Sequence, residues 1–155
     1  MATRLFLSHA HDEADLALRF AEWLEKAFSQ PVEVICTSRP DHRIESGMIT
    51  KGIVKHLRDS KAVLSLLTPE SIRGFWLYYE MGAAHALEMP FIPCLAHGLH
   101  FSDLPPQAWE YQGAELDSAE SLHSLVRSLA LLLGVGLPKA IDAETMANTL
   151  SGDLD

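Results

Sequence analysis

Cysteine is scarce in this chain, and long apolar runs are missing. Of its 155 residues only two are cysteine, Cys36 and Cys94, and each lies in a short apolar run. Two thiols in such runs are typical of buried, reduced side chains rather than of a disulfide framework or a metal site. The longest apolar stretch, residues 129–137, is too short to cross a bilayer, and no long apolar segment opens the chain as in a secretory signal. We therefore expect a cytoplasmic protein that does not insert into a membrane.

Basic side chains are also few. The chain has 12 Lys and Arg against 21 Asp and Glu, which gives a formal net charge of −9. A field of this sign disfavours nucleic acid and anionic membranes as partners, and no cluster of basic residues suggests a local groove. With 48% hydrophobic and 21% charged residues, the composition is that of one globular domain with a substantial core.

Strand and helix patterns alternate along the chain. Short apolar runs predict strands at residues 5–7, 32–36, 62–67 and 91–95 and within 110–116. Helical spacing predicts helices over residues 12–29 and 48–58, before Pro90, and over 118–133. Connections of this length predict a parallel sheet with helices on both faces. We expect one α/β domain over residues 1–136, followed at 137–155 by a polar tail or linker with one short helix.

The position of a ligand site follows from this organisation. In an open parallel sheet, ligands bind beyond the carboxyl ends of the strands, where the strand order reverses. For the order 2-1-3-4-5 this point lies between the first and third strands. The segments that follow these strands are residues 8–13 and 68–71, and they define the predicted pocket.

The first of these turns has no glycine. Its sequence, Ser8-His-Ala-His11, excludes the usual flavin or dinucleotide site, which needs glycine for close approach of backbone to phosphate. The third strand ends at Leu67-Thr-Pro69, without the aspartate of a phosphorelay receiver. His9 and His11 share one face of an extended segment, but no further ligand cluster accompanies them, so we favour a polar turn over a metal site. Gly134-Val-Gly136 follows a helix and predicts its end.

Glu80 is the residue that the pattern explains least well. On a helix, Trp76, Glu80, Ala84 and Leu87 share one stripe that is otherwise apolar. A carboxylate on an inward face loses solvation, so it must be paired, neutralised or used. One alternative is a buried ion pair with a basic residue of the segment 39–51. The other is a functional carboxylate, which we favour.

Several segments, in this order, resemble the Toll/interleukin-1 receptor (TIR) domain, especially its bacterial members. The resemblance is sharpest in the spacing Trp-x-x-x-Glu that ends at Glu80, and it extends to about residue 134. The other matching segments are Leu5-Phe-Leu-Ser-His9, Ile35-Cys-Thr-Ser-Arg-Pro40, Ile44-Glu-Ser-Gly47, residues 62–69 and Pro90-Phe-Ile-Pro93. One departure is Thr50, where many relatives carry an aromatic residue three positions after the loop-closing glycine.

The resemblance implies a flavodoxin-like three-layer sandwich with a five-stranded parallel sheet in the order 2-1-3-4-5. Enzymatic members cleave the nicotinamide–ribose bond of NAD+ with a glutamate at the position of Glu80. They release nicotinamide and ADP-ribose or a cyclic ADP-ribose isomer, so NAD+ is a substrate and no separate cofactor is expected. Bacterial relatives often serve anti-phage defence and are commonly activated by self-association.

Carried over to this chain, the resemblance makes Glu80 the catalytic residue, gripping the diol of the nicotinamide ribose. Phe6 and Trp76 are then expected to form apolar or stacking walls of the site. Supporting contacts are expected from Ser8, His9, Arg39, Ser46 and Ser71. For Ser71 the alternative is a helix N-cap, and for Arg39 it is a solvated side chain.

Two other functions stay open at this point. One is a non-enzymatic module for assembly with other TIR domains, as in adaptor proteins. The other is a module that senses NAD+ or a derivative without cleaving it. The expected partners are NAD+, further copies of the chain, and a sensor or effector domain or protein. The Trp-x-x-x-Glu spacing favours the enzyme, because a scaffold does not need a buried acid at that position.

Overall fold

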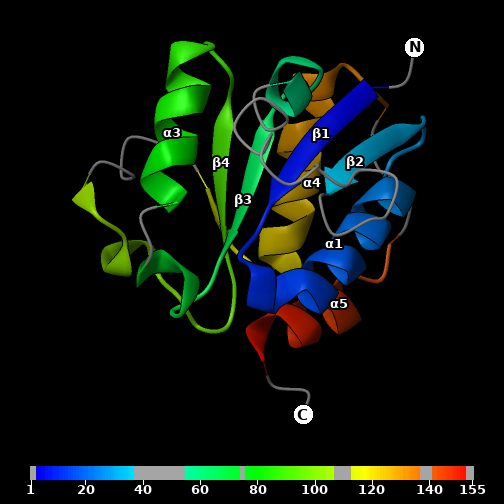
Figure 1. The fold of residues 1–155 in the computed structure, drawn as a ribbon. Helices are drawn as coiled ribbons and strands as arrows, with labels where there is room; N and C mark the ends of the chain where they lie inside the picture. The colour runs from blue at the N-terminus through cyan, green and yellow to red at the C-terminus, as the bar shows by residue number, and fades with distance from the viewer. Residues whose placement is uncertain (1–2, 37–54, 74–75, 107–112, 137–140, 153–155) are drawn as a thin grey trace.

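A five-stranded sheet forms the centre of the protein (Figure 1). The structure is a computed structural model that describes residues 3–36, 55–73, 76–106, 113–136 and 141–152. All strand pairs are parallel, and the order is β2-β1-β3-β4-β5. The strands are β1 (Thr3–Ser8), β2 (Val32–Cys36), β3 (Val63–Leu67), β4 (Phe91–Leu95) and β5 (Ala114–Glu115). The predicted α/β flavodoxin-like fold and its strand order are confirmed.

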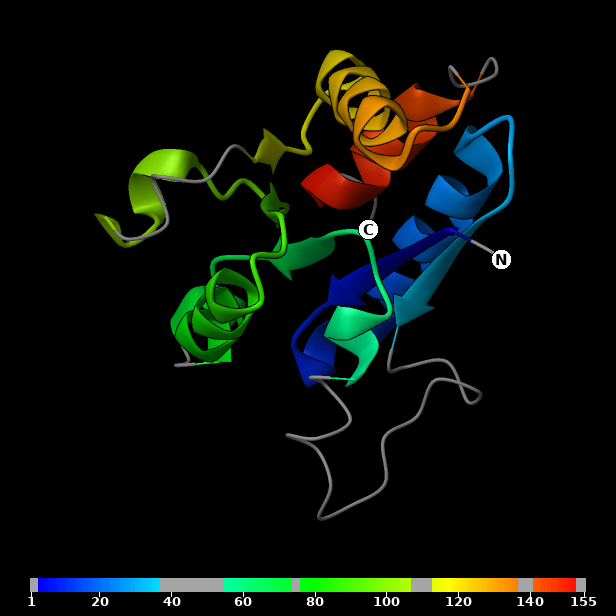
Figure 2. The same ribbon diagram turned by 90° about the horizontal axis from the view of Figure 1, so that it is seen from above.

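Helices cover both faces of this sheet, which makes three layers. The helices are α1 (Ala14–Ala27), α3 (Trp76–Ala86), α4 (Ala119–Leu133) and α5 (Ala143–Ser151). Single 3-10 turns lie at η1 (His11–Glu13), η3 (Ser71–Arg73) and η4 (Phe101–Asp103). Seen from above, α3 lies on one side of the sheet, and α1, α4 and α5 lie on the other (Figure 2). Residues 55–58 are helical, as expected from the predicted helix 48–58, whose remainder lies outside the described residues.

The strands are apolar because both faces of the sheet are buried. Side chains alternate between the faces along each strand, so the core divides into two clusters. Leu5 and Leu7 of β1 belong to the larger cluster, which packs under α1 and α4. Phe6 lies between them in sequence and belongs to the smaller cluster, with Leu77 and Met81 of α3. This alternation decides which residues at the end of each strand face α3.

The ends of α4 agree with the sequence pattern. Ser118 is its N-cap, and the backbone N–H of Ser121 donates a hydrogen bond to the Ser118 Oγ at 3.1 Å. The helix ends at Gly134, whose φ of 67° lies in the left-handed region that glycine adopts without strain. The predicted helix end at Gly134-Val-Gly136 is therefore confirmed. Nowhere in the described ranges is a helix long and apolar enough to cross a membrane.

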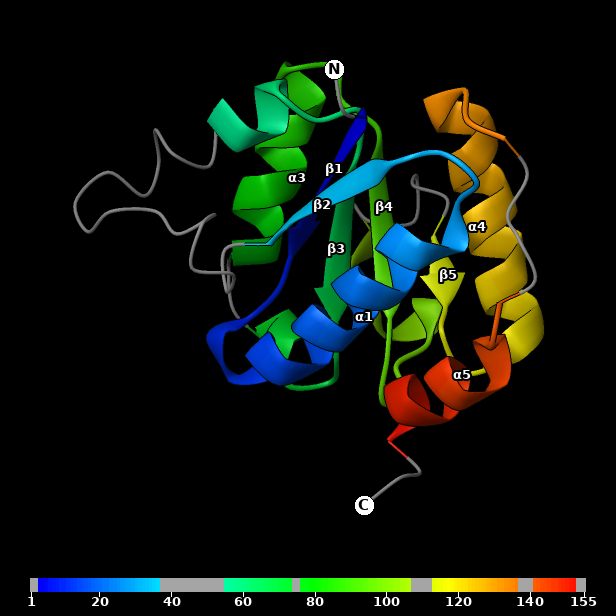
Figure 3. The same ribbon diagram turned by 90° about the vertical axis from the view of Figure 1, so that its right-hand side faces the viewer.

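Helix α5 packs against the rest of the domain. We expected a polar tail with one short helix here, and α5 buries Ala143, Ala147 and Leu150 in the cluster that α1 and α4 share. Helix α5 lies beside the lower end of α4 in Figure 3, and two hydrogen bonds hold it at its ends. The Trp23 indole donates to the carbonyl of Asp142 at 3.1 Å, and the backbone N–H of His97 donates to the carbonyl of Leu150 at 2.7 Å. The described part of the tail thus contributes to the core.

We expect Leu150→Ala to lower the free energy of unfolding by about 2–5 kcal/mol, because it removes a fully buried side chain and leaves a cavity. Urea unfolding followed by circular dichroism measures the change. The matched control is Asn148→Ala on the exposed side of α5, with an expected effect below about 0.5 kcal/mol. Equal stabilities of both variants and the wild type would show that α5 does not stabilise the domain.

Both cysteines are buried, as expected from their apolar surroundings. Burial raises the pKa of the Cys94 thiol to about 12. The thiol lies 3.6 Å from the carbonyl oxygen of Ile92, to which it donates a weak hydrogen bond. Because the thiolate is the reactive form, the native protein holds Cys94 in an unreactive state.

In the native protein we expect Cys94 to resist iodoacetamide, since its pKa of about 12 leaves almost no thiolate near neutral pH. Mass spectrometry of tryptic peptides measures the labelled fraction. Labelling of the same peptide in urea is the positive control. Rapid labelling of Cys94 without denaturant would contradict its burial.

Candidate functional site

The strand order reverses between β1 and β3, and the described site is built at their carboxyl ends. Ser8, the last residue of β1, is level with Ser65 of β3, which continues to Leu67. From this point β2 lies to one side and β4 and β5 to the other. The turns that follow β1 and β3 meet at the lower end of the sheet in Figure 3. An open α/β sheet holds its ligands at such a point.

Glu80 is the single charged side chain, among the residues described, that is fully buried. It is 2% exposed and lies in the first half of α3. Its buried neighbours on the helix are Leu77, Met81 and Ala84, which pack on the sheet. The predicted inward orientation of Glu80 is confirmed. Leu77 and Met81 are buried as well, although the sequence pattern did not assign them to the inward side. Trp76 begins α3, and its side chain lies outside the described residues.

Two buried serines lie side by side on the face of the sheet that α3 covers. Ser8 and Ser65 are register partners, and they are 6% and 1% exposed. Ser8 lies two residues after Phe6 in β1, and Ser65 lies two residues from both Val63 and Leu67 in β3. Side chains two residues apart in a strand point to the same face, so both serines belong to the face that α3 covers. The face beneath the helix that carries Glu80 therefore holds two hydroxyl groups at the end of β1.

Sequence reasoning identified Ser8 and overlooked Ser65. The signal was present, because Ser65 is the single polar residue in the apolar run 62–67. Burial of a hydroxyl in a strand that is covered on both faces costs free energy, so Ser65 calls for an explanation just as Glu80 does on its helix. The run was interpreted only as a strand, so this signal was not used.

A hydrogen-bonded group ties the two turns together. The Thr68 hydroxyl donates to Oε1 of Glu13, across the gap between the turn after β1 and the turn after β3. The backbone N–H of Ser71 donates to Oγ1 of Thr68 at 3.3 Å, and the backbone N–H of Thr68 donates to Oγ of Ser71 at 2.8 Å. Thr68 is thus the residue that caps η3, and Ser71, the first residue of η3, accepts a hydrogen bond from the backbone N–H of Thr68 in return. The N-cap role, one of the two expected for Ser71, is held by Thr68 at this turn.

Glu13 is poorly solvated in this position. Its Oε2 is buried and has no hydrogen-bond partner among the described residues. Burial raises the pKa of Glu13; the hydrogen bond from Thr68 and the charge of His97 act in the opposite direction, and Asp12 raises the pKa further. In the sequence analysis, Glu13 was included in the predicted pocket segment, residues 8–13, without a role of its own. Its partner Thr68 is 55 positions away, so no local pattern indicates the contact.

The other predicted site residues lie in different surroundings. Phe6 is 1% exposed, and its ring stacks on that of His56 with centroids 6.0 Å apart. His9 is partly buried, and its Nδ1 lies 2.7 Å from the carbonyl oxygen of Ala10. Arg39 and Ser46 lie outside the described residues. Where the structure describes the chain, no group of three or more His, Cys, Asp and Glu could hold a metal ion.

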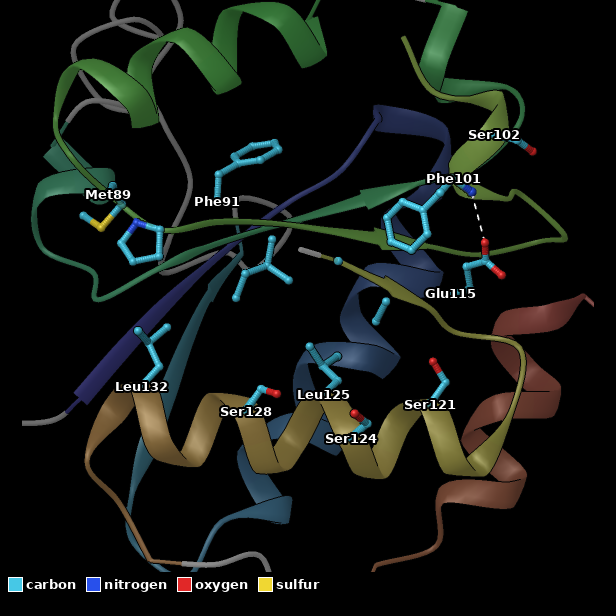
Figure 4. A pocket seen from close by; sticks show the side chains of 14 residues that line it. Met89, Phe91, Phe101, Ser102, Glu115, Ser121, Ser124, Leu125, Ser128 and Leu132 are labelled. Carbon is cyan, nitrogen blue, oxygen red and sulfur yellow. Dashed lines mark hydrogen bonds between the residues drawn. The ribbon is translucent and has the colours of Figure 1, made fainter. Parts of the chain in front are cut away.

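A groove of about 1150 Å³ lies elsewhere, between β4, β5 and α4 (Figure 4). Its walls are mainly apolar, with Phe91 and Phe101 on one side and Leu125 and Leu132 on the other. None of the predicted site residues lines its described part, and Glu115, its one described acid, is partly exposed and binds the backbone N–H of Phe101 at 3.0 Å. The groove is large enough for a ligand, but the carboxylates that are withdrawn from solvent, a feature typical of functional sites, lie elsewhere, in α3 and η1.

The fold is that of a doubly wound α/β protein with a buried carboxylate, Glu80, in the helix that follows the third strand. Comparison with models of known protein families gives no match, and no curated protein matches the sequence at a significant level. Any more specific function therefore has to be argued from the residues themselves.

Glu13→Gln is expected to stabilise the protein more at neutral than at acid pH. Because the folded pKa of Glu13 is raised above its ordinary value of 4.5, its contribution to stability is present below that pH and is lost as the pH rises through the folded pKa. Glutamine does not titrate, so the difference in Tm between variant and wild type should grow between about pH 3.5 and pH 7. Thermal unfolding measures it, with Glu22→Gln on the exposed side of α1 as control. A difference that is constant across this range would contradict the raised pKa.

Proposed function

We propose that this chain is an NAD+ glycohydrolase of the TIR type, which cleaves the nicotinamide–ribose bond and releases nicotinamide with ADP-ribose or a cyclic isomer. The observation that carries the proposal is the burial of Glu80, at 2% exposure, in the helix that follows the switch point. The buried hydroxyls of Ser8 and Ser65 on the face beneath α3 support it, because a sugar diol is bound by such groups.

The chemistry suits a site with one principal carboxylate. Glycosidases usually employ two, of which one protonates the leaving group. Nicotinamide in NAD+ already carries a positive charge and departs as a neutral molecule, so this acid is not needed. The remaining task is to stabilise the cation that develops on the ribose. A carboxylate held in a water-poor site does so without reorganisation, since charge appears where the carboxylate already points.

In this proposal each residue has a stated task. Glu80 binds the diol of the nicotinamide ribose and stabilises the transition state. Trp76 forms an apolar wall, and Phe6, which is 1% exposed, supports the site from within the core. Ser8, His9 and Ser71 line the edge at which the turns meet. Arg39 and Ser46 contribute supporting contacts from the loop after β2, and their part in the proposal rests on the sequence alone.

Activity is proposed to need self-association in the cytoplasm, in a bacterial anti-phage response. This part follows from the resemblance of the Trp-x-x-x-Glu segment to the bacterial TIR enzymes. A sensor or effector domain or protein would then bring the copies together. Dilute protein is expected to be nearly inactive, and clustered protein active.

The test is incubation of dilute and artificially clustered protein with NAD+, followed by chromatography of the products. Clustered wild type is expected to convert NAD+ into nicotinamide and ADP-ribose or its isomer. Glu80→Gln should lower kcat by about 100- to 1000-fold, because it removes the charge that stabilises the transition state. The matched control is Glu88→Gln, an exposed glutamate just beyond the same helix, which should retain activity.

Three outcomes would contradict parts of the proposal. Persistence of NAD+ in every assembled state would reject the enzyme, and assembly unchanged in Glu80→Gln would then indicate a scaffold. A rise in Tm with NAD+ but no product would indicate a sensing module. Equal turnover by Glu80→Gln would reject Glu80 as the catalytic residue. Unfolding curves of both variants must first show that they are folded.

A further inference from the structure

Glu13 joins the two turns that flank the switch point. It is the last residue of η1, directly before α1, whereas Thr68 directly follows β3. The hydrogen bond from the Thr68 hydroxyl to Glu13 Oε1 therefore spans the edge at which a doubly wound sheet binds its ligand. Thr68 is 2% exposed, so little water competes for this bond.

The hydrogen bonds continue from Thr68 toward α3. A threonine hydroxyl has one proton, and here the proton is donated to Glu13, which leaves the lone pairs of Oγ1 for the backbone N–H of Ser71 at 3.3 Å. The Ser71 hydroxyl accepts from the backbone N–H of Thr68 at 2.8 Å, and the backbone N–H of Ile72 donates to the carbonyl of Thr68 at 3.3 Å. An acceptor at Glu13 thus sets the direction of the hydroxyl around which η3 begins.

This arrangement has a cost for the folded protein. Oε2 of Glu13 is buried without a hydrogen-bond partner in the described part of the chain, although buried acceptors are nearly always satisfied. An alanine or a glutamine would avoid the burial of this charge. A carboxylate kept at such a cost, beside the ligand edge of the sheet, is typical of a residue retained for function.

We propose that Glu13 is a positioning residue, whose carboxyl oxygen accepts the hydrogen bond of the Thr68 hydroxyl and so holds the turn after β3 and thereby the segment that leads to α3 and Glu80. Where it concerns turnover, the inference rests on the proposed function. The groups that face Glu13 are Thr68 and Ser71 from the turn after β3, His97 from the turn after β4, and Asp12 from η1. The charge of His97 favours the ionised carboxylate, and that of Asp12 opposes it.

The first experiment measures hydrogen exchange and NMR shifts of the Thr68 and Ser71 amides as a function of pH, without any substrate. Glu13→Ala removes the acceptor and is expected to lower the protection factors of both amides at least tenfold. Glu13→Gln keeps an acceptor and should keep the protection, but the shifts of both amides should no longer follow the titration seen in the wild type. Glu22→Ala on the exposed side of α1 is the control and should change neither. Wild-type protection of both amides in Glu13→Ala would overturn the inference.

The second experiment measures NAD+ cleavage by clustered protein. Glu13→Ala is expected to lower kcat on the order of 10- to 100-fold with little change in KM, because Glu80 is displaced rather than removed. Glu13→Gln, which keeps an acceptor for the Thr68 hydroxyl, should retain most of the wild-type kcat. A wild type that cleaves no NAD+ would reject the proposed function and leave the exchange result to decide on Glu13. Full turnover by Glu13→Ala would overturn the positioning role while Glu80 remained the catalyst.

Discussion

Burial of the sheet on both faces is the constraint on which the rest of the structure depends. Each strand must then be apolar along its length, and a polar group inside it carries a desolvation cost. Three of the buried polar residues, Ser8, Ser65 and Thr68, nevertheless gather at the carboxyl ends of β1 and β3. These ends are also where the strand order reverses, so the sheet concentrates its buried polar groups at the edge that suits a ligand.

Two carboxylates from different elements are also withdrawn from solvent. Glu80 is buried within the helix layer that covers one face, and Glu13 lies in the turn before the helix on the other. Neither position favours a charge, since burial raises the pKa of Glu13 and leaves Glu80 at 2% exposure. In the proposal, Glu80 stabilises the cation that develops on the ribose, and Glu13 positions the segment that leads from β3 to α3. Both tasks use the same physical property, a charge with little water around it.

Much of the fold could be predicted from periodicity. The apolar runs at residues 32–36 and 91–95 match β2 and β4, and the serine and glycine at the ends of α4 match its first and last turns. The burial of Glu80 was predictable for the same reason, because helical spacing places it among apolar neighbours. Ser65 could have been identified by an equally local signal, a single serine in an apolar strand, but it was not. The packing of α5 could not be predicted, because a short helix with a polar exterior has the same sequence pattern whether it packs on the domain or extends away from it.

The sequence by itself determined the alternation of strands and helices and the inward side of α3, since each depends on neighbours within a few residues. Only the tertiary structure decided that Glu13 meets Thr68, that Ser8 lies beside Ser65, and that α5 joins the core. These contacts join residues far apart in the chain. Their energies come from burial and hydrogen bonding that exist only once the strands are in register, so no local pattern records them.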